Sequence, residues 1–129
     1  MAAHSLGLVA LLVPDYDAGL AFYRDVLGFV QECDEDQGGG KRWVVLRPNA
    51  GGTGVLLARA EGAAQHAATG NQTGGRVGFF LNTSDFAADH ARMLAAGVVF
   101  EEEPRVEPYG TVAVFRDPFG NRWDLLELV

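Results

Sequence analysis

The side chains best suited to metal, acid–base or thiol chemistry are scarce in this sequence: three histidines, His4, His66 and His90, and a single cysteine. No two histidines stand at His-x-His or His-x-x-x-His spacing, which would direct both imidazoles to one metal ion. His4 lies at the start of the chain, where an exposed tail is expected. His90 falls among apolar residues, which indicates a structural role. His66 is therefore the histidine best placed to touch a ligand.

The cysteine, Cys33, lies in the run Glu32–Asp36, which is otherwise entirely acidic. Neighbouring carboxylates raise the pKa of a thiol, and this disfavours a catalytic thiolate. One cysteine cannot form a disulfide within the chain, which favours a reducing compartment such as the cytoplasm. The glycine-rich stretches lack the lysine and hydroxyl residues of a phosphate-binding loop, so they are interpreted as turns.

Composition narrows the remaining classes of function. The 129 residues carry a formal charge of −7, and 48% of them are hydrophobic. These values predict a folded chain and disfavour nucleic acid as a partner. The longest apolar run, Leu6–Val13, is too short to cross a membrane and lacks the basic start of a signal peptide. The length suits one domain or two half-size modules that share a core.

An internal repeat is the most informative pattern. The apolar run Val9–Val13 precedes a helical pattern that ends at Gly28, and Val77–Leu81 precedes another that ends at Gly97. The two runs are offset by 68 residues and the two glycines by 69. The sequence therefore predicts two copies of one structural unit.

Each copy begins with a strand and a helix. Apolar side chains recur at helical spacing after the first run, with Asp15 as the expected N-cap. In the second helix either Ser84 or Asp85 can serve as the cap, and Gly97 is expected to end the helix. The residues expected on the buried helix faces are Tyr16, Leu20, Tyr23 and Leu27, and then Phe86, His90, Met93 and Leu94.

Short strands follow each helix. The turn between the last two, Asp117-Pro118-Phe119-Gly120, has the residue order of a type I turn. The polar segment 61–75 is expected to link the copies, with room for one helical turn. The strands expected after the helices are Phe29–Glu35, Arg42–Arg47 and Gly54–Arg59 in the first copy, and Val98–Glu101, Thr111–Arg116 and Arg122–Leu128 in the second.

The predicted fold class is α+β, with two βαβββ modules that form a curved eight-stranded cleft. Within a single domain, 1–129, module one covers about 1–60, the linker about 61–75 and module two about 76–129. Each module has a helix for only one face of its sheet. The other face is therefore expected to line a ligand cleft between the modules.

Three segments carry a resemblance to a known superfamily: Pro14-Asp15 after the first strand, residues 21–29, and residues 117–125. Together with the repeat, they resemble the vicinal oxygen chelate superfamily, which contains glyoxalase I, bleomycin-resistance proteins, extradiol dioxygenases and fosfomycin-resistance enzymes. The resemblance covers nearly the whole chain and implies the glyoxalase/bleomycin-resistance fold. It leaves the chemistry open, because one fold hosts many reactions.

The resemblance also implies where a metal would bind. In glyoxalase-like members, His, Gln or Glu side chains on the first and last strands of each module hold a divalent ion. The corresponding residues here are Leu8, Leu56, Arg76 (or Val77, by a different count) and Asp124. Leucine has no donor atom and a guanidinium repels a cation, so a single carboxylate remains. We therefore expect no metal and no other cofactor.

The family's strand polarity implies which side chains face the expected cleft, and they are apolar and aromatic with a few charges. Trp43 and Phe80 could instead be core residues, since aromatic side chains are common in cores. Arg76 and Asp124 could orient a ligand or simply pair with each other. The predicted ligand-binding residues are Leu8, Trp43, Arg76, Phe80, Tyr109, Arg122 and Asp124.

The first hypothesis for the function is a metal-independent small-molecule-binding protein of the drug-sequestering or resistance type, with an apolar or aromatic ligand. The alternative is a lyase, isomerase or epimerase acting on a small oxygenated substrate, with Asp124 as general base and Arg76 stabilising an oxyanion. A second ionisable group beside Asp124 would favour catalysis, and a dry aromatic surface would favour binding. A third hypothesis is a metal enzyme with ligands from His4 or His66.

A homodimer is the expected assembly. Members of the resembled family commonly pair, and short chains with open sheets have strand edges and apolar faces to cover.

Overall fold

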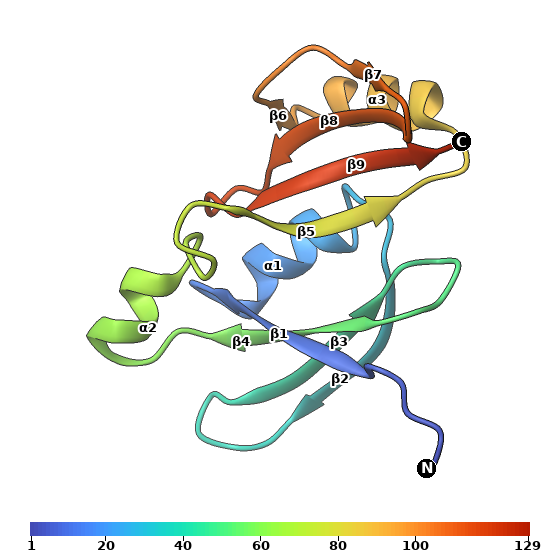
Figure 1. Cartoon of the computed structure of the whole chain (residues 1–129). Coiled ribbons are helices and arrows are strands. Elements are labelled where there is room, and N and C mark those ends of the chain that lie inside the picture. Colours follow the sequence, from blue (N-terminus) through green and yellow to red (C-terminus); the bar gives the residue numbers. More distant parts are fainter. The chain divides into compact units, whose positions relative to one another are not determined.

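The computed structural model describes all residues, 1–129, and divides them into two compact units, Met1–Ala67 and Ala68–Val129. The boundary falls inside the segment 61–75 that is expected to link the copies. Each unit contains a mixed sheet with a helix packed against it (Figure 1). No helix in either unit combines the length and the hydropathy needed to cross a membrane.

The first unit contains four of the strands and most of α2. Its elements are β1 (Leu8–Val13), α1 (Tyr16–Tyr23), β2 (Val30–Asp36), β3 (Arg42–Arg47), β4 (Gly54–Arg59) and α2 (Gly62–Ala68). The sheet has the order β1-β4-β3-β2, with β1 parallel to β4 and the other neighbours antiparallel. The short α2 occupies the place where one helical turn is expected.

Helix α1 begins where the sequence predicts. The Asp15 carboxylate accepts a hydrogen bond from the backbone N–H of Ala18 at 2.7 Å, which satisfies an otherwise unpaired donor. The chain leaves the helical region at Gly28, whose φ of +81° suits glycine. The expected apolar stripe is confirmed, because Tyr16, Leu20, Tyr23 and Leu27 are all buried.

Gly19 determines how closely α1 approaches the sheet. A Cβ atom at this position would lie 2.8 Å from Leu57 Cδ1 and 3.1 Å from Val13 Cγ1, closer than packed carbons allow. The side chains of Val13 and Leu57 therefore face α1, and both are buried. This contact identifies which face of the first sheet the helix covers.

The second unit repeats this plan with one more strand. Its elements are β5 (Val77–Asn82), α3 (Phe86–Ala95), β6 (Val99–Phe100), β7 (Arg105–Glu107), β8 (Gly110–Arg116) and β9 (Arg122–Leu128). β9 lies between β5 and β8, parallel to β5 and antiparallel to β8, while β6 and β7 both pair with β8. The α+β class is confirmed.

The structure has nine strands where eight are expected. The additional strand is β7, which is three residues long and lies between Pro104 and Pro108. Proline is depleted in strands, so the sequence gives no strong strand pattern at this place.

Helix α3 has a narrower buried face than expected. Asp85 rather than Ser84 is the cap, and its carboxylate accepts from the Ala88 N–H at 3.1 Å. Met93 is buried, whereas Leu94 is 50% exposed, so the expected burial of Leu94 is wrong. The two residues are a step of about 100° apart around the helix, and the sheet covers only the Met93 side.

An aromatic row joins α3 to the second sheet. His90 stacks on Phe86 with ring centroids 5.5 Å apart and meets Phe100 edge-on at 4.6 Å. Phe100 in turn contacts Phe115, which stacks with Trp123. Phe115 and Trp123 therefore lie on the side of the sheet that α3 covers, and His90 is part of this packing.

The turn between β8 and β9 is organised by one buried carboxylate. Asp117 is 4% exposed, and its Oδ1 accepts hydrogen bonds from the backbone N–H groups of Phe119, Gly120 and Asn121 at 2.8–2.9 Å. Its Oδ2 accepts from the side-chain amide of Asn121 at 2.7 Å. The Gly120 N–H also reaches the Asp117 carbonyl, as a type I turn requires. One side chain thus fixes the path on which β9 returns beside β8.

Replacing Asp117 by alanine should lower the free energy of unfolding by about 2–4 kcal/mol, because several buried donors would lose a charged acceptor. Equilibrium unfolding in urea measures the change. Asp25→Ala is the matched control, since that carboxylate is exposed and pairs with its exposed neighbour Arg24. The control should leave the urea midpoint of unfolding nearly unchanged. Equal effects of the two substitutions would contradict the role given to Asp117.

Candidate functional site

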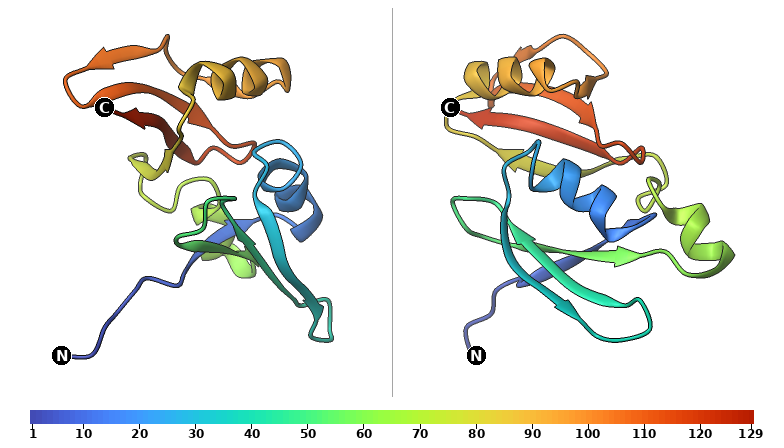
Figure 2. Two further views of the ribbon diagram at one scale, coloured as in Figure 1. Left: turned by 90° about the vertical axis from the view of Figure 1, so that its right-hand side faces the viewer. Right: turned by 180° about the vertical axis from the view of Figure 1, so that it is seen from behind.

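Each sheet has one face without a helix. α1 covers the face of the first sheet that carries Val13 and Leu57, and α3 covers the face of the second that carries Phe115 and Trp123. The ribbon shows each helix on a single side of its own sheet (Figures 1 and 2). Because side chains alternate along a strand, the intervening residues lie on the opposite side, called here the open face of each unit.

The open face of the first unit is mainly apolar, but Arg47 shares it with Leu8 and pairs with Glu32. Leu56 on β4 lies opposite Ala10 on β1 and Val45 on β3. Alternation adds Leu8 and Trp43 to the same face. Trp43 is 38% exposed, and Leu8 is half-buried. The structure thus brings the two predicted ligand-binding residues of this unit onto one surface.

The open face of the second unit centres on a carboxylate. Asp124 on β9 lies opposite Phe80 on β5 and Val114 on β8. The Asp124 Oδ1 atom is buried and has no hydrogen-bond partner. The neighbouring Phe80 ring is 63% exposed. A buried acceptor without a donor costs free energy, so such an atom in a native protein points to a role other than stability.

Two arginines act electrostatically on Asp124, but both are held by other carboxylates. The ion pairs of this region are Arg105–Glu102, Arg105–Glu107, Arg122–Glu101 and Arg116–Glu101, at 2.7–3.4 Å. Burial raises the pKa of Asp124, and the charge of Glu102 adds to the rise, while Arg105 and Arg122 oppose it. The arginines therefore do not offset the burial of this carboxylate.

Glu102 is the acidic neighbour of Asp124. Its Oε2 atom accepts a hydrogen bond from the backbone N–H of Val114 at 2.9 Å. Val114 lies in the part of β8 between the residues that pair with β6 and those that pair with β7. Burial works against ionisation of Glu102, but hydrogen bonds from Arg105 and Val114 outweigh it, so the pKa of Glu102 is lowered. Two carboxyl groups that interact with each other thus have pKa values displaced in opposite directions.

Arg105 and Glu102 are the functional candidates that sequence reasoning missed. Both belong to the region around β7, which lacks a clear strand pattern. Tyr109, which is among the predicted residues, follows β7, is 48% exposed and is one of the groups that raise the pKa of Arg105, after Glu102 and Glu107. The alternation of Arg105 and Glu107 shortly before Gly110 is the signal that could have revealed the short strand.

Arg76 does not take the position expected for it. A β-bulge at Gly78 interrupts the register between Val77 and the rest of β5. Arg76 and Phe80 would share a face only in a regular strand, because one extra residue reverses the alternation. Arg76 precedes β5, is exposed and forms no ion pair with Asp124. The ion pair between Arg76 and Asp124 that the sequence suggested is therefore not formed.

The residues present do not fit the divalent metal that the superfamily resemblance implies. Of the four implied positions, Leu8 and Leu56 have no donor atom and Arg76 is a cation, which leaves Asp124. No group of three or more His, Cys, Asp or Glu side chains is arranged to hold a metal ion. The side chains at these positions therefore do not suit a divalent metal ion.

Two of the histidines, His4 and His66, and the cysteine belong to the first unit. His4 is exposed in the segment before β1, and His66 is exposed on α2. Cys33 on β2 is half-buried, and burial together with the charge of Glu35 raises the pKa of its thiol. A raised pKa leaves less of the reactive thiolate, in line with the sequence-based expectation.

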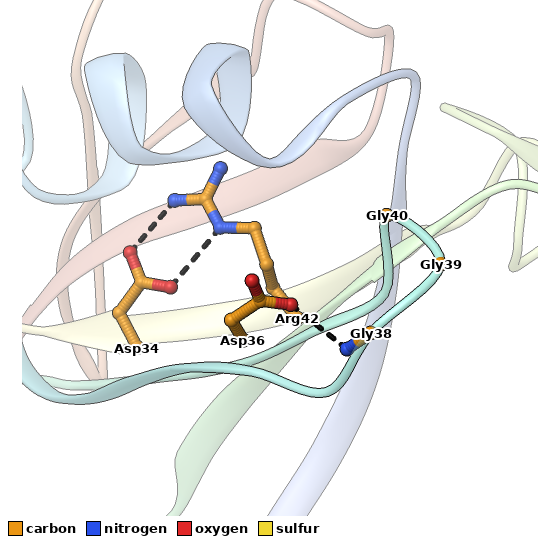
Figure 3. A pocket seen from close by; sticks show the side chains of 6 residues that line it. All are labelled: Asp34, Asp36, Gly38, Gly39, Gly40 and Arg42. Atoms are coloured by element: carbon orange, nitrogen blue, oxygen red, sulfur yellow. Dashed lines mark hydrogen bonds and ion pairs between the residues drawn. The ribbon is translucent and has the colours of Figure 1, made fainter.

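A separate surface hollow lies at the turn between β2 and β3 (Figure 3). Its volume is about 430 Å³, and its lining consists of Asp34, Asp36, Arg42 and the glycines 38–40. Arg42 donates two hydrogen bonds to Asp34, at 2.7 and 3.0 Å, and Asp36 accepts the Gly38 N–H at 2.8 Å. Arg42 also donates to Asp17 at 3.0 Å, outside the hollow, so its guanidinium is held by two carboxylates. None of the predicted ligand-binding residues lines this hollow.

Comparison with known proteins identifies the family. Residues 5–125 match the Glyoxalase/Bleomycin resistance protein/Dioxygenase superfamily. The chain belongs to this superfamily, and the resemblance inferred from its motifs and repeat is confirmed.

Individual relatives match along nearly their whole length. An uncharacterised protein of Shewanella frigidimarina (strain NCIMB 400) is 47% identical over 126 residues, which cover 93% of this chain and 90% of that protein. The crystal structure of TnmS3, an antibiotic binding protein from Streptomyces sp. CB03234, is 28% identical with a TM-score of 0.80 and covers 100% of this chain and 99% of its own. The crystal structure of UcmS2 is 31% identical with a TM-score of 0.81 and covers 98% of both chains.

Asp124→Leu should raise the midpoint temperature of unfolding by a few degrees at neutral pH, because it removes a half-buried carboxylate whose Oδ1 atom is buried and unsatisfied. Leucine already stands at the corresponding position of the first unit, Leu56, which lies 68 residues earlier. Differential scanning calorimetry measures the shift, and Glu103→Leu, at an exposed carboxylate, is the control.

The pH dependence of this gain has a definite sign. Because the folded-state pKa of Asp124 is raised, the wild-type protein loses stability as pH rises through the range in which the carboxyl ionises. The advantage of Asp124→Leu should therefore be smallest below the ordinary pKa of 3.8, where the carboxyl is protonated in both states, and grow above it. A lowered midpoint at neutral pH would instead mark Asp124 as a structural residue.

Proposed function

We propose that this protein binds an apolar or aromatic small molecule on the open faces of its sheets, without a metal ion, and that it belongs to the drug-sequestering or resistance type. The observation that carries the proposal is the Asp124 Oδ1 atom, buried and without a partner beside an exposed aromatic ring. A ligand donor would satisfy this atom, and a ligand ring would cover the exposed phenyl group.

The character of the two open faces supports this proposal. Trp43 on the first and Phe80 on the second are large aromatic side chains with substantial exposure. Aromatic rings that no helix covers are common in binding sites, where they supply contact area at low cost in conformational entropy. TnmS3, at 28% identity, is an antibiotic binding protein. Of the predicted residues, Leu8, Trp43, Phe80, Tyr109, Arg122 and Asp124 remain candidates in their observed places, and Arg76 would act only from outside the strand.

An enzyme of the lyase, isomerase or epimerase class is the second candidate. The observation that favours it is the pair of carboxyl groups, Glu102 and Asp124, with pKa values displaced in opposite directions. Such a pair can provide one group that stays ionised and one that exchanges a proton. Asp124 would take a proton from a carbon beside a carbonyl, and the electron pair would move to the carbonyl oxygen. Arg105 or Arg122, rather than Arg76, would face that developing charge.

The assembly and location complete the proposal. We propose a homodimer, because the open faces leave apolar side chains such as Leu56 and Trp43 without a helix to cover them. A reducing, cytoplasmic location agrees with the single Cys33, which has no disulfide partner in the chain.

Acridine, an uncharged planar probe at neutral pH, should bind to the purified protein and quench tryptophan fluorescence. Phe80→Ala should weaken this binding by about 3- to 10-fold through loss of ring stacking. Val106→Ala is the control, because this residue is 86% exposed on β7 and, opposite Thr111, lies on the other side of the sheet. Chelation of divalent ions with EDTA should leave the dissociation constant unchanged.

The two candidate functions give different results in heavy water. A small molecule that copurifies, detected by native mass spectrometry, should leave the protein without gaining deuterium if the protein only binds it. Deuterium at a carbon of the recovered molecule would favour the enzyme. If the protein neither binds acridine nor copurifies with a small molecule, the binding function is contradicted.

Light scattering tests the assembly. The expected mass is twice the chain mass of 13.8 kDa at micromolar concentration. A Trp43→Glu variant, which places a charge on the apolar open face, should shift the mass toward the monomer if that face lies in the interface. A monomeric wild-type protein would refute the homodimer.

A further inference from the structure

We propose that Arg116 and Arg122, neighbours at one end of the second sheet, bind an anionic oxygen group of the ligand, either a carboxylate or a phosphate. The inference rests on the proposed binding function and adds one chemical feature to the ligand. It follows from the ion pairs of the two units, which the internal repeat allows to be compared position by position.

In the first unit, one arginine holds both a glutamate and the chain before the first strand. Arg47 on β3 donates to the two oxygens of Glu32, at 2.5 and 3.2 Å, and to the backbone carbonyl of Gly7 at 3.3 Å. Gly54 on β4 leaves the space for this side chain, because a Cβ atom there would lie 3.0 Å from Arg47 Cζ. A single guanidinium group therefore fastens the segment before β1 to the sheet.

In the second unit, an arginine from another strand makes the corresponding bonds. Glu101 and Gly75 correspond to Glu32 and Gly7 through the offset of 68 or 69 residues. Arg122 on β9 donates from Nε to Glu101 at 2.7 Å and from Nη1 to the Gly75 carbonyl at 2.9 Å. It occupies the position at which the first unit has a glycine on β4. Arg122 thus takes over the structural task in this unit.

Arg116, the counterpart of Arg47 in the repeat, is left without that task. Its one ion pair joins Nε to Glu101 at 3.4 Å, which is long for a charge-assisted hydrogen bond. Its side chain is 48% exposed, compared with 26% for Arg47. The two terminal nitrogens of Arg116 have no acceptor in the chain. Their N–H groups are therefore available to a ligand.

Arg116 and Arg122 also stand opposite each other on neighbouring strands. They are register partners on β8 and β9, and both pair with the same oxygen of Glu101. Like charges directly opposite on antiparallel strands destabilise a sheet, and one carboxylate neutralises only one of the two guanidinium groups. The first unit avoids this conflict, since a glycine takes the place of the second arginine. An anion bound beside the two arginines would remove the excess positive charge.

The position of the two arginines on the open face sets how such a ligand would lie. By alternation they share this face with Asp124, which lies opposite Phe80. Asp124 follows Arg122 by two residues, about 7 Å along the strand. A ligand ring over Phe80 could therefore direct an acidic substituent past Asp124 to the arginine end. Guanidinium groups bind carboxylates and phosphates through paired N–H donors, which defines the chemical class of that substituent.

Three probes built on one ring system test this assignment: 2-naphthoate, 2-naphthyl phosphate and the uncharged 2-naphthamide. Isothermal titration calorimetry gives their dissociation constants. The wild-type protein should bind the two anions about 5- to 30-fold more tightly than the amide, as expected for charge-assisted hydrogen bonds. The tighter of the two anions identifies carboxylate or phosphate as the group that the arginines accept.

Three variants separate Arg116 from general charge effects. Arg116→Gln should reduce the preference for the anions to less than about twofold. Arg92→Gln is the matched control, because Arg92 on α3 is also 48% exposed and also pairs with a carboxylate at 3.4 Å. This control removes the same charge and should keep the preference. Arg116→Lys keeps the charge but loses the planar pair of donors, so it should retain only part of the preference.

Thermal unfolding separates a binding role of Arg116 from a structural one. Without a probe, Arg116→Gln should unfold at the wild-type temperature or slightly above it, because a contact between like charges is relieved. Saturating 2-naphthoate should raise the midpoint of the wild type and of Arg92→Gln, but not that of Arg116→Gln. A marked drop in the midpoint of Arg116→Gln without a probe would make its ion pair structural and overturn the inference.

The binding results distinguish this inference from the proposed function. Equal affinity for the three probes, tighter binding of the amide, or an anion preference that survives Arg116→Gln would overturn the inference. An equal loss of the preference in Arg92→Gln would also overturn it, because net charge would then be responsible. If acridine binds and none of the naphthyl probes does, the inference fails and the binding function stands. If acridine fails to bind as well, both fail together.

Discussion

One helix cannot cover both faces of a sheet, and this constraint shapes the whole chain. α1 has eight residues and α3 has ten, and each packs on a single side of its sheet. Val13, Leu57, Phe115 and Trp123 are buried on that side. The other side also has buried residues, among them Val45 and Val114, but no helix of its own unit covers it. The candidate site lies on this side.

The internal repeat allows the open faces of the two units to be compared position by position. Position 56 in the first unit and position 124 in the second correspond by the offset of 68 residues, yet one is leucine and the other aspartate. Around Leu56 the open face is apolar. Around Asp124 the second unit adds β7 and with it Arg105 and Glu102, which have no counterparts in the four-stranded sheet of the first unit. The same backbone plan thus holds a leucine among apolar neighbours in one unit and a carboxylate near ion pairs in the other.

Local signals in the sequence predicted the scaffold well. Asp15, Gly28 and the turn that starts at Asp117 act on their nearest neighbours along the chain, so residue type alone indicates their structure. The face of β9 to which Asp124 belongs was inferred from the family resemblance together with the alternation of side chains.

Features that depend on distant partners were harder to predict. The bulge at Gly78 changed the side to which Arg76 belongs, and a glycine within a strand is only a weak sign of a bulge. Leu94 is exposed because the sheet does not extend beneath it. Glu102 reaches the site by bonding Val114, 12 residues further along, and no short motif encodes such a contact.

That last contact has a consequence for how copies of the protein meet. The outer edge of β8 is shared by two short strands, β6 and β7, and between them the Glu102 carboxylate takes the Val114 N–H. An uninterrupted strand edge offers a row of donors and acceptors to which a foreign strand can add, and this is a common start of aggregation. Here the row is divided, and its gap holds a negative charge that an incoming backbone carbonyl would avoid. Two short strands and the Glu102 side chain between them therefore cover this edge of β8 together.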